Sequence, residues 1–142
     1  MRGKGLSLRS GYEIVMPVIE SWVIDDGSGL PVSPEVVVER LRARIDGGQR
    51  ETWLSSSCGR LVAFVTNTER AAVSLLDEEG DAGEHAVDPG ADGSSEGFVL
   101  SNGQHDEYAD EDTVPLEEAL RIIECIVSEG SWPVDARWVV DR

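Results

Sequence analysis

The chain has 142 residues, 40% of them hydrophobic and 28% charged, which fits one globular domain and argues against wholesale disorder. Its formal net charge is −16: residues 1–70 balance nine basic against nine acidic side chains, whereas residues 71–142 hold three basic and nineteen acidic ones. Because the second half repels phosphate, direct binding of nucleic acid is not expected.

The chain holds two cysteines, Cys58 and Cys125, 67 positions apart. This spacing provides neither a disulfide framework nor the CxxC pairs of a zinc site, so both are expected to be free thiols in a reducing compartment. No segment approaches the roughly 20 apolar residues of a membrane span. We therefore expect a cytoplasmic protein with a flexible leader at residues 1–15 and a single domain at 16–142.

The beginning of this domain predicts a strand followed by a helix. β-branched and aromatic residues over 14–24 indicate the strand, and the sequence Asp25-Asp-Gly-Ser-Gly after it indicates a turn. A Ser-Pro pair beginning at Ser33 is typical of a helix start, and the pair Gly47-Gly48 is typical of its end. The helix is therefore expected at about 34–46.

The middle of the chain consists of short β-rich runs separated by turn residues. Three of them are spaced as a meander of antiparallel strands, and a fourth lies within a loop rich in Asp, Glu, Gly and Ser. The pair Asn102-Gly103, suited to a two-residue type I′ turn, then predicts a hairpin. The four runs are residues 51–56, 61–67, 71–76 and 84–87.

The end of the chain predicts a second helix at about 114–129 and a short strand at 136–140. Pro115 stands in the first turn of this helix and Gly130 follows its last residue, with apolar side chains at helical spacing between them. The whole pattern indicates an α+β fold, with a mostly antiparallel sheet of about five to seven strands packed against two helices. The tryptophans assigned to its core are Trp22, Trp53 and Trp138.

Few residues suggest catalysis or metal binding. His85 and His105 each have an acidic neighbour, but adjacent residues on a strand point to opposite faces, so neither pair forms an acid–base couple. The acidic segments beginning at Asp77 and Asp88 each miss a residue that a calcium loop needs. We expect no catalytic residue, no metal and no cofactor. The alternative is a small enzyme that uses Cys58 with His85.

An acidic run from Asp106 to Asp112 surrounds Tyr108 with five carboxylates immediately before the second helix. Such a run is either a solvated turn or a docking surface for a basic partner. In a docking surface Tyr108 would be an aromatic anchor, and the surrounding charges would speed the encounter.

Several motifs in the second half of the chain occur together in one known family. They are the run Phe98-Val-Leu-Ser-Asn-Gly-Gln-His-Asp-Glu-Tyr, the run Val114-Pro-Leu-Glu-Glu-Ala-Leu, and then Gly130, Pro133 and Trp138. Over roughly this last half, the chain resembles the first-numbered immunity-protein family of bacterial polymorphic toxin systems. The first half agrees with the family in its order of strand, helix and meander.

The resemblance implies a small α+β protein without enzymatic activity, which binds and blocks a cognate toxin with a basic surface, often a deaminase-fold enzyme that acts on nucleic acid. We expect it to occlude the toxin's active site, to contact neither nucleic acid nor membrane, and to be a monomer or weak dimer when free. A regulatory or scaffold domain with another basic partner is the alternative. The residues expected to bind the partner are Asp106, Glu107, Tyr108, Asp110, Glu111, Asp112 and Trp132.

Overall fold

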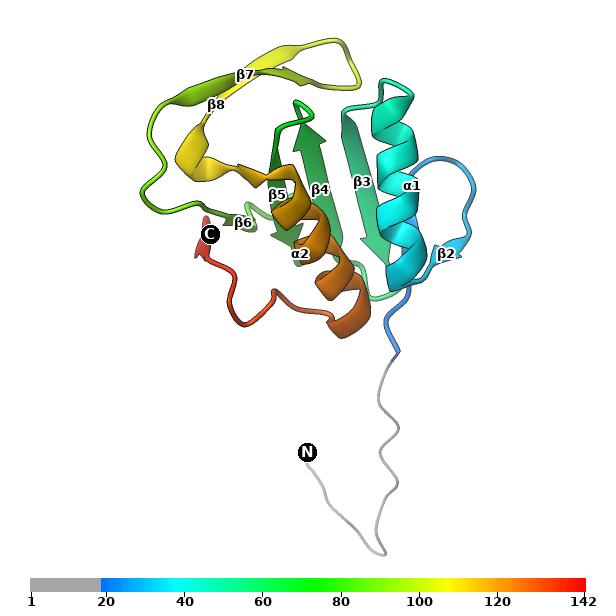
Figure 1. Ribbon diagram of the computed structural model, residues 1–142. Helices are drawn as coiled ribbons and strands as arrows, with labels where there is room; N and C mark the ends of the chain where they lie inside the picture. Colours follow the sequence, from blue (N-terminus) through cyan, green and yellow to red (C-terminus); the bar gives the residue numbers. More distant parts are fainter. Residues whose placement is uncertain (1–18) are drawn as a thin grey trace, which may run out of the picture.

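Two helices cover one face of a mostly antiparallel sheet, and a two-stranded hairpin lies across one end of it (Figure 1). The computed structural model describes residues 19–142, so the expected leader at 1–15 lies outside the described residues. The arrangement confirms the expected α+β class. The main sheet has eight strands, and the hairpin adds a separate sheet of two.

The main sheet is built around the predicted meander. β3 (Glu51–Ser56), β4 (Leu61–Thr66) and β5 (Arg70–Leu76) pair antiparallel in chain order. The other strands are β1 (Trp22–Ile24), β2 (Pro31–Val32), β6 (Glu84–Ala86), β9 (Val114–Pro115) and β10 (Trp138–Val140). The strand order is β10-β6-β5-β4-β3-β1-β2, with β9 paired to β5 off this path. β1 begins later than the strand predicted over 14–24, of which positions 14–18 lie outside the described residues.

Alternation along the strands gives the sheet one buried face and one helix-free face. Leu54 on β3, Phe64 on β4 and Val73 on β5 are fully buried in the core. The helices that cover them are α1 (Pro34–Asp46) and α2 (Leu116–Glu129). Each fully buried aliphatic or aromatic side chain contributes about 1.5–3 kcal/mol to folding, which holds the two layers together. We call the helix-free surface of the sheet the open face.

The ends of α1 follow from its capping residues, as predicted. The Ser33 hydroxyl accepts a hydrogen bond from the Val36 N–H at 3.3 Å, which satisfies one of the free donors of the first turn. At the other end the chain leaves the helix at Gly47, and Gly48 adopts a positive φ of 89°.

The second helix begins at Leu116, two residues after the predicted start at 114. Val114 and Pro115 instead form β9, opposite Ala71 and Arg70 of β5. Their backbone is extended because it is paired with a strand far earlier in the chain, a contact that no local signal reveals. The predicted end is confirmed, since Gly130 adopts the left-handed conformation that closes the helix.

β7 (Ser94–Val99) and β8 (His105–Ala109) form the predicted hairpin, but its turn differs. The Leu100 N–H donates to the Gln104 carbonyl at 2.8 Å, so three residues lie in the loop rather than two. Within this loop Gly103 has a positive φ of 89°, whereas a type I′ turn needs a positive φ at Asn102 as well. A single left-handed glycine is typical of the three-residue hairpin loop.

The tryptophans divide between the core and the surface. Trp22 is 1% exposed and belongs to the core, as predicted, but the predictions for Trp53 and Trp138 are wrong. Trp53 is 37% exposed, because it alternates with the buried Leu54 on β3 and therefore lies on the open face. Trp138 is 40% exposed because β10 is the edge strand of the sheet.

Candidate functional site

The open face has a tryptophan beside a row of small side chains. In the ladder, Trp53 lies opposite Ala63, Ala63 opposite Ser74, and Ser74 opposite His85, so these four residues form one row across β3, β4, β5 and β6. Residues directly opposite each other in an antiparallel sheet share a face. Because alanine and serine fill little space next to an indole, the surface is hollowed beside Trp53.

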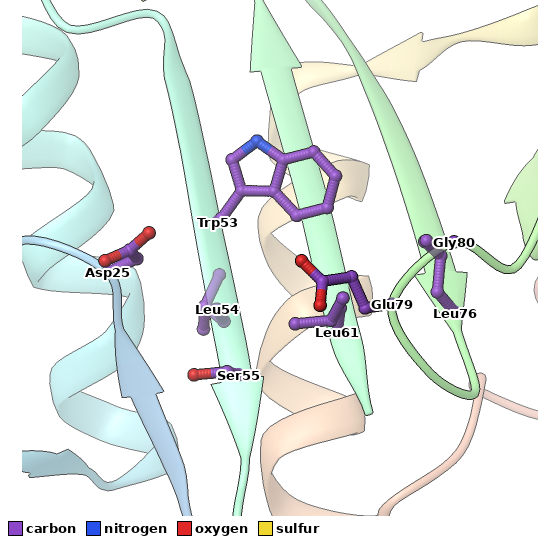
Figure 2. Close-up of a pocket in the computed structure, with 8 residues that line it drawn as sticks. All are labelled: Asp25, Trp53, Leu54, Ser55, Leu61, Leu76, Glu79 and Gly80. Carbon is purple, nitrogen blue, oxygen red and sulfur yellow. The ribbon is translucent and has the colours of Figure 1, made fainter. Parts of the chain in front are cut away.

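The first hollow, here named the Trp53 hollow, has a volume of about 480 Å³. Figure 2 shows the Trp53 indole lying across the sheet over β3 and β4, with the Glu79 carboxylate beside Leu61. Asp25 stands at the opposite border, in the turn after β1. The Trp53 hollow is therefore an apolar surface with an acid on each side.

The second hollow, here named the hairpin slot, has a volume of about 420 Å³ and shares Trp53 with the first. Its floor consists of Ala63, Val65, Ala72 and Ser74 from β4 and β5, and the hairpin contributes Tyr108 and, from its turn, Leu100. Tyr108 is held in place by the buried ring of Phe98, whose centroid lies 4.7 Å away in an edge-to-face arrangement.

Hydrogen bonds fix the hairpin to the sheet and so define the slot. The Ser101 N–H donates to the Glu51 carboxylate at 2.8 Å, and the Asn67 amide donates to the Glu96 carbonyl at 2.9 Å. The Arg50 guanidinium adds a bond of 3.2 Å to the carbonyl of Gly97. The turn of the hairpin and the middle of β7 are therefore tied to the main sheet and its adjoining residues.

The charge of the two hollows is entirely negative apart from one histidine. Within residues 19–142, no Lys or Arg lines either of them. The Trp53 hollow is bordered by Asp25 and Glu79, and the hairpin slot by Glu51, Asp112 and His85. A surface of this kind attracts a cationic partner that also carries apolar side chains.

Glu51 and Asp106 are neighbouring carboxylates at the mouth of the slot. The hydrogen bond from the Ser101 backbone, followed by that from the Trp53 indole at 3.0 Å, outweighs burial and holds the pKa of Glu51 below its usual range. Asp106 accepts a hydrogen bond of 2.9 Å from the Tyr108 hydroxyl. Burial and this carboxylate together raise the pKa of Tyr108 to about 12, so the phenol stays protonated.

His85 is clasped by two carboxylates at the other end of the slot. Its Nδ1 lies 2.7 Å from Asp141 and its Nε2 3.0 Å from Asp112. Burial lowers the pKa of His85, but the hydrogen bonds to the two carboxylates outweigh it and raise the pKa overall. Both ring nitrogens are thus engaged, which leaves neither to accept a proton from Cys58, an exposed residue of the β3–β4 turn.

The acidic run expected to bind the partner does not form one surface. Tyr108 and Asp112 line the hairpin slot, and Asp106 adjoins it through the Tyr108 hydroxyl. Glu107 is exposed and pairs with Ser94, and Glu111 is exposed. Asp110 is engaged internally: its carboxylate accepts from Ser95 at 2.5 Å and its carbonyl from Arg70 at 3.0 Å.

Trp132 is not the exposed anchor that the sequence suggested. Its side chain is 7% exposed, stacks on Trp138 with ring centroids 5.6 Å apart, and donates its indole N–H to Glu84 at 2.7 Å. The segment after α2 turns this ring inward because its indole finds both an aromatic and an acceptor there. Trp53, assigned to the core from the sequence, is instead the tryptophan available to a partner.

Several residues of the open face could not be found as a site in the sequence. Asp25 and Glu79 belong to turns far apart in the chain, and Glu51 begins a strand that carries apolar residues on both faces. The only local signal was the series of small residues at alternate positions of β4 and β5, Ala63 with Val65 and Ala72 with Ser74, which marks a face with space above it.

No helix within residues 19–142 is long and apolar enough to cross a membrane, and no group of three or more metal-ligating side chains in that part of the chain could hold a metal ion. In comparisons with known proteins, no family model matches the chain and no curated protein matches it significantly.

Proposed function

We propose that this protein is an immunity protein, which binds a cognate toxin with a basic surface and blocks it without performing chemistry. The toxin we expect is an enzyme that acts on nucleic acid, such as a deaminase, because such an enzyme needs a cationic cleft for its phosphate-bearing substrate. The motifs of the second half of the chain support this proposal through their family resemblance.

The observation that carries the proposal is the open face itself. A half-exposed tryptophan lies there between two hollows bordered by carboxylates, and no Lys or Arg of residues 19–142 lines them. Tryptophan anchors within charged surroundings are typical of tight protein interfaces, because the ring supplies buried area and the charges guide the encounter.

The mechanism that follows is occlusion. The acidic border of the open face would lie over the cationic cleft of the toxin and exclude its nucleic acid, while Trp53 would be buried against the toxin. Opposite potentials raise association rates by about one to three orders of magnitude at low salt. Apolar burial then lowers the dissociation rate.

The test is rescue of growth when the chain is produced together with the product of the neighbouring gene. We expect the wild type to rescue, and a variant with four open-face acids changed to amides to fail. The matched control changes four exposed acids of the helices and therefore has the same net charge. The open-face changes are Asp25→Asn, Glu51→Gln, Glu79→Gln and Asp112→Asn, and the helix changes are Glu35→Gln, Glu39→Gln, Glu124→Gln and Glu129→Gln.

The tryptophans provide a second matched pair. Trp53→Ser should abolish rescue, whereas Trp138→Ser, which removes a ring of similar exposure from β10, should retain it. Circular dichroism establishes that each variant is folded. Failure of the folded wild type to rescue would refute immunity and favour a regulatory or scaffold domain with another basic partner. Rescue by all variants would keep immunity but move the interface away from the open face.

A further inference from the structure

The hairpin slot combines an apolar floor with aromatic walls. Ala63, Val65 and Ala72 present carbon atoms only, and Trp53 and Tyr108 stand above them. The volume of about 420 Å³ lies within the range of about 300–1,000 Å³ found for small-ligand sites. A slot of this size has room for a single long side chain.

The mouth of the slot carries negative charge that the described residues do not neutralise. At the far end Asp112 has a partner in His85, 3.0 Å away. Glu51 and Asp106, in contrast, form no ion pair with any Lys, Arg or His of residues 19–142, and the charge of Asp106 acts on Glu51 unfavourably. Two neighbouring carboxylates of this kind favour a cation between them.

We propose that the hairpin slot binds one arginine side chain of the protein partner, with its methylenes on the floor and its guanidinium between Glu51 and Asp106. This inference rests on the proposed function and identifies the group by which the partner is recognised. Arginine fits better than lysine for two reasons. Its planar fork can serve two carboxylates at once, and its weakly hydrated face stacks on aromatic rings.

The test uses N-acetyl-arginine amide as the probe, followed through the backbone amide resonances of the protein. We expect saturable shifts at Ala63, Ser74 and Tyr108. N-acetyl-citrulline amide, which has the same shape without the charge, should bind at least about tenfold more weakly, and N-acetyl-lysine amide should also bind more weakly.

Variants localise the binding. Glu51→Gln and Asp106→Asn should each weaken the arginine probe by about tenfold, whereas the double variant Glu35→Gln, Glu39→Gln on α1 should bind it like the wild type. Equal shifts with citrulline, shifts that lie outside the slot, or affinity unchanged in both slot variants would each overturn the inference.

This experiment needs no toxin, so it separates the two proposals. The wild type could rescue growth, and the open-face variant fail to do so, while the protein does not bind the arginine probe. That result would overturn the arginine-binding inference and keep the proposed function. Arginine binding in a protein that does not rescue would support the slot and refute immunity.

Discussion

At the scale of single residues, His85 shows how the fold favours one protonation state. Ionised carboxylates only accept hydrogen bonds, so the ring donates to both Asp112 and Asp141 when it carries two protons and a positive charge. The clasp joins β6, the 3-10 turn at Asp110–Asp112 and the residue after β10. It therefore closes one end of the hairpin slot.

The stabilisation from this clasp should depend on pH in a defined direction. Because the pKa of His85 is raised in the folded state, its contribution is fully present below the unfolded value of about 6.5 and is lost as pH rises through the folded pKa. The difference in unfolding free energy between wild type and His85→Gln, measured in urea, should therefore be largest near pH 6 and shrink above it.

The exposed His105 in the hairpin supplies the control, since His105→Gln removes a ring without a clasp. Near pH 6 its effect on the unfolding free energy should be smaller than that of His85→Gln, because the His105 ring is exposed. An NMR titration of His85 with a midpoint at or below about 6.5 would contradict the assignment, as would a His85→Gln difference that grows with pH.

At the scale of elements, one arginine positions the turn that supplies Asp112. Arg70 on β5 donates to the hydroxyl and carbonyl of Thr113 at 2.8 and 2.9 Å, to the carbonyl of Asp110 at 3.0 Å, and to the Asp88 carboxylate at 2.7 Å. Its fork thus joins β5 to the 3-10 turn and to the loop after β6.

Arg70→Lys should therefore cost about 2 kcal/mol of unfolding free energy, because a lysine cannot serve four acceptors in different directions and leaves the hydroxyl and carbonyl of the buried Thr113 without this donor. Arg121→Lys on α2 is the matched control. That arginine bonds to Glu118 at 2.8 Å on the surface, and its replacement should cost about 0.5 kcal/mol or less. Equal urea midpoints for the two variants would show that Arg70 does not hold the turn.

The same elements show which features a sequence can reveal. Both ends of α1 and the existence of the hairpin are encoded within a few residues, at Ser33, at Gly47 and at Asn102-Gly103, and they could be predicted. β9 could not, because Val114 becomes extended only by pairing with Ala71. The side chains of the acidic run from Asp106 to Asp112 also do not share one surface. They alternate between the two faces of β8 and then follow the 3-10 turn, so they point in different directions.

The orientation of β3 is the step at which the candidate site was missed. A buried strand could include all three of Thr52, Trp53 and Leu54. The alternation of residues along the sequence therefore does not decide on which face of the sheet the Trp53 indole lies. The helices decide it, because they cover Leu54 and leave Trp53 outside. The site depends on which face the helices cover and on turns far apart in the chain, so it exists only once the sheet has assembled.

At the scale of the whole molecule, the net charge of −16 opposes folding while it favours a basic partner. Ion pairs relieve only part of the repulsion, because 28 acidic side chains share 12 basic ones. Arg142 illustrates the shortage, since it lies within 3.1 Å of Asp77, Asp81 and Glu84. Repulsion among the remaining carboxylates should therefore dominate the dependence of stability on salt.

The unfolding free energy should rise when NaCl is increased from about 10 mM to about 150 mM, since the screening length falls from about 30 Å to about 8 Å. Urea midpoints at the two concentrations measure the change. A variant with four exposed acids replaced, Glu78→Gln, Asp92→Asn, Glu96→Gln and Glu111→Gln, should be more stable at low salt and gain less from added salt. A wild-type midpoint that falls with salt would instead mean that ion pairs outweigh repulsion. In the expected case, low salt destabilises the free protein most and also strengthens its attraction to a basic partner. Binding of such a partner would therefore stabilise the fold most at low salt.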